Sequence, residues 1–131
     1  MRCERADTTK VAASDAPELS SAAPDGDEQR LRIGVIDSGV LPEHPALRKV
    51  VVTRKDFVTH EALRPQTHGT AVSSLIARSA GDNVSIYSAS VFFQAGNYAP
   101  GATTESLVAA LDWLASEQVD VINMSLAGPG N

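Results

Sequence analysis

The chain has 131 residues, of which 43% are hydrophobic and 21% are charged, and this length suffices for one domain with a real core. Its net charge of −5 argues against a nucleic-acid partner bound through basic patches. No apolar run approaches the roughly 18 residues that a membrane helix needs. Neither a nucleic acid nor a membrane is therefore an expected partner.

Residues 1–30 differ in composition from the rest of the chain. The stretch ERADTTKVAASDAPELSSAAPDGDEQ is rich in Ala, Ser, Asp, Glu and Pro and has no sustained apolar period. So few large apolar residues do not offset the entropy lost when a chain becomes ordered. We predict a disordered tail or linker over 1–30; the alternative is the remnant of a propeptide or neighbouring domain. MRCERADTTK is charged where a secretory signal would become apolar, so no signal peptide is predicted.

From Leu31 onward, strand and helix patterns alternate. LRIGVIDSG is a short apolar run that ends in a carboxylate and a glycine, as a strand buried on both faces would. Strands separated by helices and joined by short loops indicate βαβ units, so we predict an α/β fold with a mostly parallel sheet and flanking helices. The further strands are predicted at KVVVT (49–53), VSIYSASVF (84–92) and VDVINMSL (119–126), and the helices at HGTAVSSLIARSA (68–80) and TTESLVAALDWLASEQ (103–118).

Apolar side chains at helical spacing mark the expected buried face of each helix. In the first helix these are Val72, Leu75 and Ile76. The second helix is expected to begin with Thr103 or Thr104 as its N-cap. Its apolar stripe comprises Leu107, Val108, Leu111, Leu114 and Ala115.

Two polar residues stand at the ends of these apolar elements. Asp37 closes the first strand, where a carboxylate is costly to bury unless something hydrogen-bonds to it. His68 opens the first helix, and the following Gly69 leaves room for another backbone to approach. Taken singly, each has an ordinary explanation: a strand-end Asp that caps a turn, and a surface histidine at a helix start.

Three segments taken together resemble the subtilisin-like serine proteases, the subtilases. They are IGVIDSGVLPEHPAL, QTHGTAVSSLIA and VDVINMSLAGPG, in this order and at these separations. The resemblance covers the chain from about Leu31 to its end. It implies that 31–131 is the N-terminal part of a subtilase catalytic domain, with a subtilisin-like three-layer fold that is incomplete at the C-terminus.

The resemblance also implies roles for individual residues. Asp37 matches the triad aspartate that orients the histidine, and His68 matches the histidine that takes a proton from a serine. A peptide or protein substrate is the implied partner, bound by main-chain pairing with a strand of the protease. The loop AGNYAPGA (95–102) is similar in position to the segment that pairs with the substrate's other edge. The substrate-pairing strand itself matches Ser125, Leu126, Ala127 and Gly128.

The sequence also departs from the family pattern. Neither the G-T-S-x-A context of the catalytic serine nor the preceding oxyanion-hole Asn is present, and Ser73 and Ser74 are expected to point away from the site. We therefore predict a fragment of a serine endopeptidase that is inactive alone and needs the missing C-terminal half of the domain. That absence is expected to leave an edge or a face of the VDVINMSL strand uncovered. The alternative is a non-catalytic peptide-binding or degenerate subtilase-like protein.

No metal and no cofactor are expected. Ala46 stands where subtilisins with the strong calcium site usually carry an Asp ligand, and the stretch 76–84 is short where those enzymes insert a calcium loop. A hard cation needs several converging oxygen ligands, and this region offers too few. An extracellular location would be typical of the family.

Overall fold

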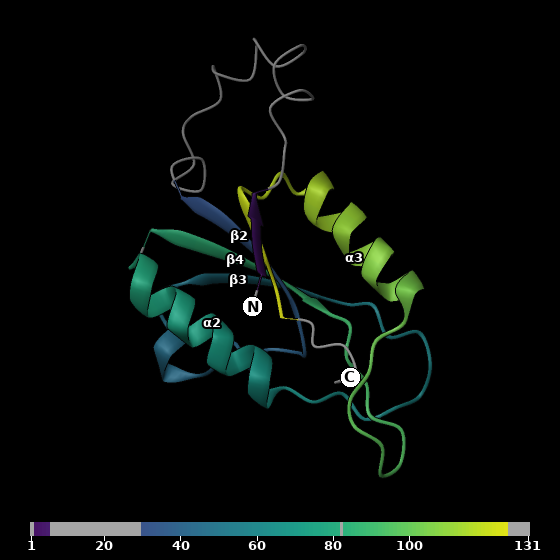
Figure 1. Cartoon of the computed structure of the whole chain (residues 1–131). Helices are drawn as coiled ribbons and strands as arrows, with labels where there is room; N and C mark the ends of the chain where they lie inside the picture. Colours follow the sequence, from purple (N-terminus) through teal and green to yellow (C-terminus); the bar gives the residue numbers. More distant parts are fainter. Residues whose placement is uncertain (1, 6–29, 82, 126–131) are drawn as a thin grey trace.

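The computed structural model describes residues 2–5, 30–81 and 83–125. Four strands, β2 to β5, run parallel, and β1 pairs antiparallel with β5, which gives the sheet order β1-β5-β2-β4-β3 (Figure 1). This arrangement confirms the α/β fold with a mostly parallel sheet. The elements are β1 (Arg2–Arg5), β2 (Leu31–Asp37), η2 (Pro45–Leu47), β3 (Val51–Asp56), α2 (Thr67–Ala80), β4 (Val84–Ser90), α3 (Thr104–Ser116) and β5 (Val121–Met124).

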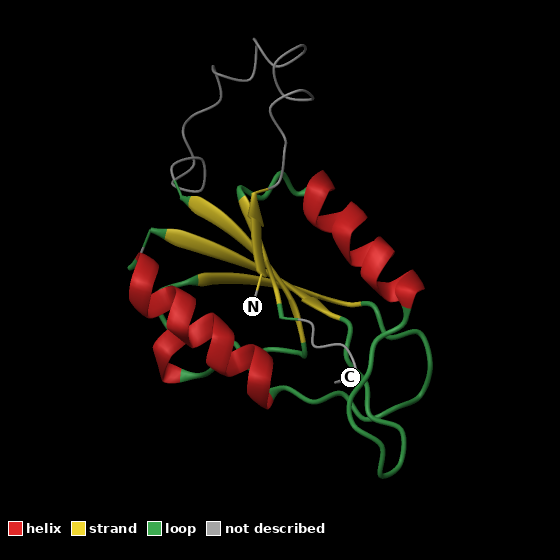
Figure 2. Cartoon of the chain, in the orientation of Figure 1, coloured by secondary structure: helices red, strands yellow, loops and turns green. Residues whose placement is uncertain are grey.

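The two helices cover opposite faces of the sheet, so the chain forms three layers (Figure 2). All seven residues of β4 are buried, and successive side chains point to opposite faces because a strand has a period of two. Val84 and Ile86 accordingly join the core beneath α2, whereas Tyr87 and Ala89 join the core beneath α3. None of the helices in the described ranges is long and apolar enough to span a membrane.

The expected buried face of α2 is partly wrong. Val72 is buried and Ile76 is partly buried, but the side chain of Leu75 is 56% exposed. Leu75 and Ile76 line an open apolar groove of about 370 Å³ whose floor includes Ile33 of β2 and Asn123 of β5. Within residues 30–81 and 83–125, part of the face beside β5 is thus left open, in line with the expected uncovered face.

The expected stripe of α3 is also partly wrong. Leu114 is fully buried, but Val108 and Leu111 are exposed, and the small residues Ser106 and Ala110 face the sheet instead. Leu114 packs against β2 where Gly34 has no side chain: a Cβ on Gly34 would lie 2.9 Å from Leu114 Cδ1.

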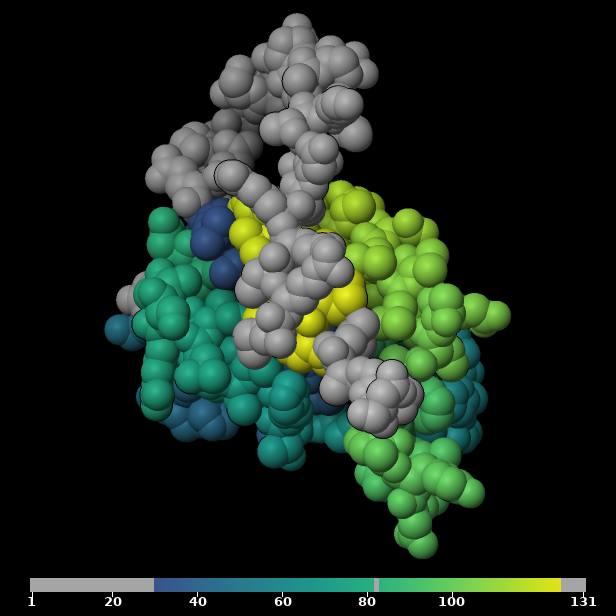
Figure 3. Space-filling view, viewed as in Figure 1, coloured from purple at the N-terminus to yellow at the C-terminus, as the bar shows by residue number. Residues whose placement is uncertain are grey.

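The outer edge of β5 is occupied by β1, a strand that the sequence analysis did not anticipate. Arg2 is paired with Met124, and Arg5 is paired with Val121. The expectation of an uncovered β5 edge is therefore wrong over these four residues. In the space-filling view β5 is visible between the layers of α2 and α3 (Figure 3).

Replacing Ser73 by Ala is expected to stabilise the chain. Ser73 lies on the buried side of α2, and its hydroxyl has no hydrogen-bond partner among the described residues. A buried polar group without a partner costs about 1–3 kcal/mol, so its removal should raise the free energy of unfolding by an amount of that order. Urea denaturation of the 131-residue chain measures the change.

Ser74→Ala is the matched control for this substitution. The Ser74 hydroxyl is only partly buried and donates to the Thr70 carbonyl at 2.7 Å, so its loss should not stabilise the chain. Equal midpoints for Ser73→Ala and the parent chain would show that the Ser73 hydroxyl has a partner in solution.

Candidate active site

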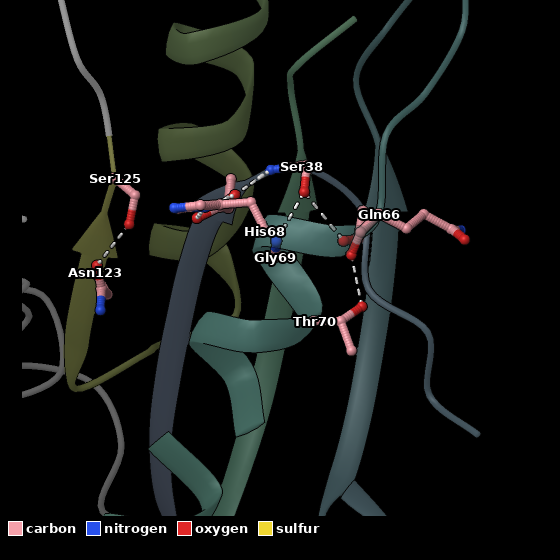
Figure 4. Close-up of polar contacts among 9 residues, drawn as sticks. Ser38, Gln66, His68, Gly69, Thr70, Asn123 and Ser125 are labelled. Atoms are coloured by element: carbon pink, nitrogen blue, oxygen red, sulfur yellow. Dashed lines mark hydrogen bonds and ion pairs between the residues drawn. The ribbon is translucent and has the colours of Figure 1, made fainter. Parts of the chain in front are cut away.

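The candidate site lies at the carboxyl end of the parallel strands, where ligands bind in open α/β sheets. Asp37 is the last residue of β2, and β5 ends at Met124, just before Ser125. His68 is the second residue of α2, which begins beside the end of β2 (Figure 4). Three segments that are far apart in the sequence thus bring polar groups to one edge of the sheet.

Asp37 and His68 are in direct contact, as the sequence led us to expect. His68 Nδ1 lies 2.8 Å from Asp37 Oδ1 and 3.0 Å from Oδ2. The Asp37 side chain is 1% exposed, whereas that of His68 is 67% exposed. Because a carboxylate only accepts hydrogen bonds, this contact favours the tautomer with the proton on Nδ1 and leaves Nε2 as an acceptor.

Ser38 contacts both the Asp37 carboxylate and the start of α2. No role was predicted for it from the sequence. Its backbone N–H donates to Asp37 Oδ1 at 2.6 Å, which supplies a second partner to the buried carboxylate. Its hydroxyl accepts from the Gly69 N–H at 2.8 Å. A Cβ on Gly69 would overlap the carbonyl oxygens of Ser38 and Gly39, so glycine is what allows α2 to begin this close to β2.

Thr70 forms a second link between the start of α2 and the loop after β2. Its hydroxyl donates to the Gln66 carbonyl at 2.6 Å and accepts from the Leu41 N–H at 2.9 Å. Gln66, the N-cap, makes no capping bond with its own side chain. The sequence offered one clue to these two links. A hydroxyl residue follows each residue of the acid–histidine pair closely: Ser38 comes directly after Asp37, and Thr70 comes two residues after His68.

A cleft of about 280 Å³ opens beside the histidine. Ser125 forms part of its wall, and the Ser125 N–H donates to the Ile36 carbonyl at 3.3 Å, which carries the line of β5 past its end. Of the predicted substrate-pairing residues only Ser125 is placed here; Leu126, Ala127 and Gly128 lie outside the described residues. The cleft is lined by Asp37, Ser38, Pro65, His68, Phe92, Pro100 and Ser125.

Two loops frame the cleft beyond the strand ends. In the predicted loop 95–102, Pro100 reaches the cleft, and Phe93 and Gly101 exchange two backbone hydrogen bonds of 2.9 Å that close the base of the loop. The Gln94 N–H donates to the Leu63 carbonyl at 2.9 Å and joins this loop to the segment that precedes α2. Pro100 of this loop thus lines the same cleft as His68, and the pairing of the loop with a substrate stays a prediction.

The described residues contain no hydroxyl bonded to the open Nε2 of His68. Ser74 donates to the Thr70 carbonyl, Ser73 is buried within the fold, and the Ser125 hydroxyl lies 3.4 Å from Asn123 Oδ1. Within the same ranges, no three His, Cys, Asp or Glu side chains come together in a group that could hold a metal ion. The site as described is an acid–histidine pair beside a cleft.

Comparisons with known proteins agree with this geometry. The family model described as the subtilase family matches residues 28–131. The chain is 31% identical over 109 residues to subtilisin DY of Bacillus licheniformis, which covers 76% of this chain and 38% of that protein. It is 31% identical over 125 residues to subtilisin E of Bacillus subtilis (strain 168), covering 87% of this chain and 31% of that protein.

A halolysin of Haloferax mediterranei is also similar, with 30% identity over 108 residues that cover 73% of this chain and 21% of the halolysin. The chain thus spans between about a fifth and two fifths of the length of these relatives. Most of the chain, including both residues of the acid–histidine pair, falls within the family match. The chain belongs to the subtilase family.

Proposed function

We propose that this chain supplies the aspartate and the histidine of an Asp–His–Ser triad in a serine endopeptidase. The observation that carries the proposal is the 2.8 Å contact between His68 Nδ1 and the buried Asp37, with the rest of the ring exposed beside a cleft. Membership of the subtilase family supports the same chemistry. The nucleophilic serine is proposed to come from residues outside these 131.

The roles of the pair follow from its geometry. Asp37 holds the proton on Nδ1 and faces the positive charge that develops on the ring during the reaction. Nε2 of His68 takes the proton from the serine hydroxyl as that oxygen attacks the peptide carbonyl. The same nitrogen then returns the proton to the leaving amine. Asp37 remains ionised throughout.

The substrate is proposed to be an extended peptide that pairs with the chain at residues 125–128. Ser125 continues the line of β5, and a bound peptide would add its main chain beside this segment. Phe92, Pro65 and Pro100 give the cleft apolar walls. An apolar side chain near the cleaved bond is therefore the preferred occupant of the cleft.

Expression of the complete reading frame that contains these residues tests the proposal. The product is expected to cleave casein and to react with a fluorophosphonate probe, and His68→Ala should abolish both. His44→Ala is the matched control, because His44 is an exposed histidine at the N-cap of η2 whose side chain accepts from the nearby Ala46 N–H, away from the cleft. A folded product that neither cleaves nor reacts would overturn the proposal.

The same experiment decides the alternative, a non-catalytic peptide-binding protein. In that case an unreactive product would still bind an extended peptide at the cleft. Chemical-shift changes at Ser125 and His68 on addition of the peptide, without cleavage, would identify this outcome.

A further inference from the structure

A second pocket, of about 190 Å³, lies at the carboxyl ends of β3 and β4. It is next to the candidate active site, because segments 37–40 and 65–68 contribute residues to both. Gly39, Val40 and Gln66 line this pocket, whereas their chain neighbours line the cleft that contains His68. A step of one residue along each segment, from Ser38 to Gly39 and from Pro65 to Gln66, leads from one lining to the other.

The pocket is positively charged in a chain whose net charge is −5. Arg54, Lys55, Asp56 and Arg64 line it. Arg64 uses four of its five N–H donors within the chain: Nε donates to Asp56 Oδ2 at 2.5 Å, and its Nη atoms donate to three backbone carbonyls of residues 58–62 at 3.0–3.1 Å. Arg64 neutralises Asp56, and the Lys55 ammonium lies over the Phe57 ring, 5.4 Å from its centroid, so Arg54 carries the excess charge that faces the pocket.

Arg54 has hydrogen-bond donors to spare. Its Nη1 donates to the Val40 carbonyl at 3.4 Å, the one hydrogen bond that its side chain makes to a described residue. A guanidinium has five N–H donors in a planar fork that matches a carboxylate. The remaining donors are therefore available to a ligand with two acceptor oxygens.

Two serines on β4 add hydroxyl groups beside this arginine. Ser88 is 1% exposed and Ser90 is 9% exposed, and both line the pocket. In the register of the sheet, Ser88 is paired with Arg54 and Ser90 with Asp56. Both serines line the pocket, so their hydroxyls can donate to a ligand held there.

We propose that this pocket binds the carboxylate of an aspartate or glutamate side chain in the peptide substrate. Arg54 donates to both carboxylate oxygens, and the hydroxyls of Ser88 and Ser90 donate from the adjacent strand β4. The identity of the ligand as part of a substrate rests on the proposed peptidase function, whereas the carboxylate chemistry rests on the pocket alone. The consequence is a preference for peptides with one acidic residue at a fixed distance from the cleaved bond.

The test is a titration of the full 131-residue chain, followed by two-dimensional ¹H–¹⁵N NMR. The probes are acetyl-Ala-Ala-Glu-Ala-Ala-amide, its Gln analogue and free glutarate. The Glu peptide is expected to shift the Arg54 Nε and the Ser88 and Ser90 amides, and to bind about tenfold more tightly than the Gln peptide, because charge-assisted bonds are the stronger ones. Arg54→Gln should remove the difference between the two peptides.

Three variants make the result specific. Arg78→Gln is the matched control, since Arg78 is an exposed arginine in the last turn of α2, and it should keep the preference of about tenfold. Ser88→Ala combined with Ser90→Ala should weaken the preference without changing the charge of the pocket. His44→Ala, at an exposed histidine outside both pockets, should leave the preference unchanged; because the readout is binding without cleavage, it is separate from the catalytic role of His68.

Equal binding of the Glu and Gln peptides would overturn the proposal, as would a preference that survives Arg54→Gln. Glutarate that binds as tightly as the Glu peptide, with the same shifts, would identify a site for small anions and overturn the assignment to a substrate side chain. Weaker glutarate binding supports the peptide, because its main chain then contributes to the affinity.

Discussion

Replacing Asp37 by Asn is expected to lower kcat about 10⁴-fold in the protein expressed from its complete reading frame, the loss typical of a triad aspartate. The asparagine side chain is nearly the same size, but its amide group would donate to Nδ1 of His68, where the native carboxylate accepts at 2.8 Å. The ring would then carry its proton on Nε2, which could no longer accept one from the nucleophile. KM should change little, because Asp37 is 1% exposed and lies beneath His68.

Steady-state kinetics on a chromogenic peptide measure this loss, and circular dichroism with thermal denaturation checks that the variant folds. Asp112→Asn is the matched control, because Asp112 is an exposed acid on α3 and its change should leave kcat intact. The double variant Asp37→Asn/His68→Ala should be no slower than His68→Ala alone, because residues that act as a unit are not additive. A loss below about tenfold for Asp37→Asn would contradict the assigned role.

The parallel strands were predictable because they are buried. β2 and β4 lie between two helical layers, so most of their residues are buried and apolar, although three of the seven residues of β4 are serines. β3 is different: the prediction ended at Thr53, but the strand continues through Arg54 to Asp56. It is an edge strand with mostly exposed residues, and its polar second half carries no apolar signal.

Other features depend on contacts that periodicity does not encode. β1 has no alternating apolar pattern, and its pairing with β5 joins the two ends of the described chain. The outward position of Val108 depends on how α3 is turned against the sheet, with Ala110 and Leu114 on the buried side, and packing between elements sets that orientation. A hydrophobic stripe identifies a helix more reliably than it identifies the side that is buried.

In the candidate site, too, some residues were predictable from the sequence and others were not. The contact between Asp37 and His68 was predictable because a strand end and a helix start meet at one edge of a parallel sheet. Ser38 was missed because its hydroxyl acts on a backbone N–H 31 residues away. Arg54 was missed because a charged residue on an edge strand has the same sequence signal as a solvated surface residue.

Replacing Gly69 by Ala is expected to damage both the fold and the site. An added Cβ would overlap the carbonyl oxygens of Ser38 and Gly39, which are backbone atoms and cannot rotate away. α2 must then move from the end of β2, which breaks the 2.8 Å bond from the Gly69 N–H to Ser38 Oγ and separates His68 from Asp37. Overpacking of this kind costs about 1–3 kcal/mol, which exceeds the gain of up to about 1 kcal/mol from alanine's higher helix propensity.

Urea denaturation of the 131-residue chain should therefore show a lower midpoint for Gly69→Ala. Gly101→Ala is the matched control, since a Cβ at Gly101 meets open space and its midpoint should not fall. In the protein from the complete reading frame, kcat should drop about 10²-fold, the loss that a displacement of roughly 1 Å produces at a catalytic group. A Gly69→Ala chain as stable as the parent would show that α2 does not begin this close to β2. The hydrogen bond from the Gly69 N–H to Ser38 Oγ would then not be what positions His68.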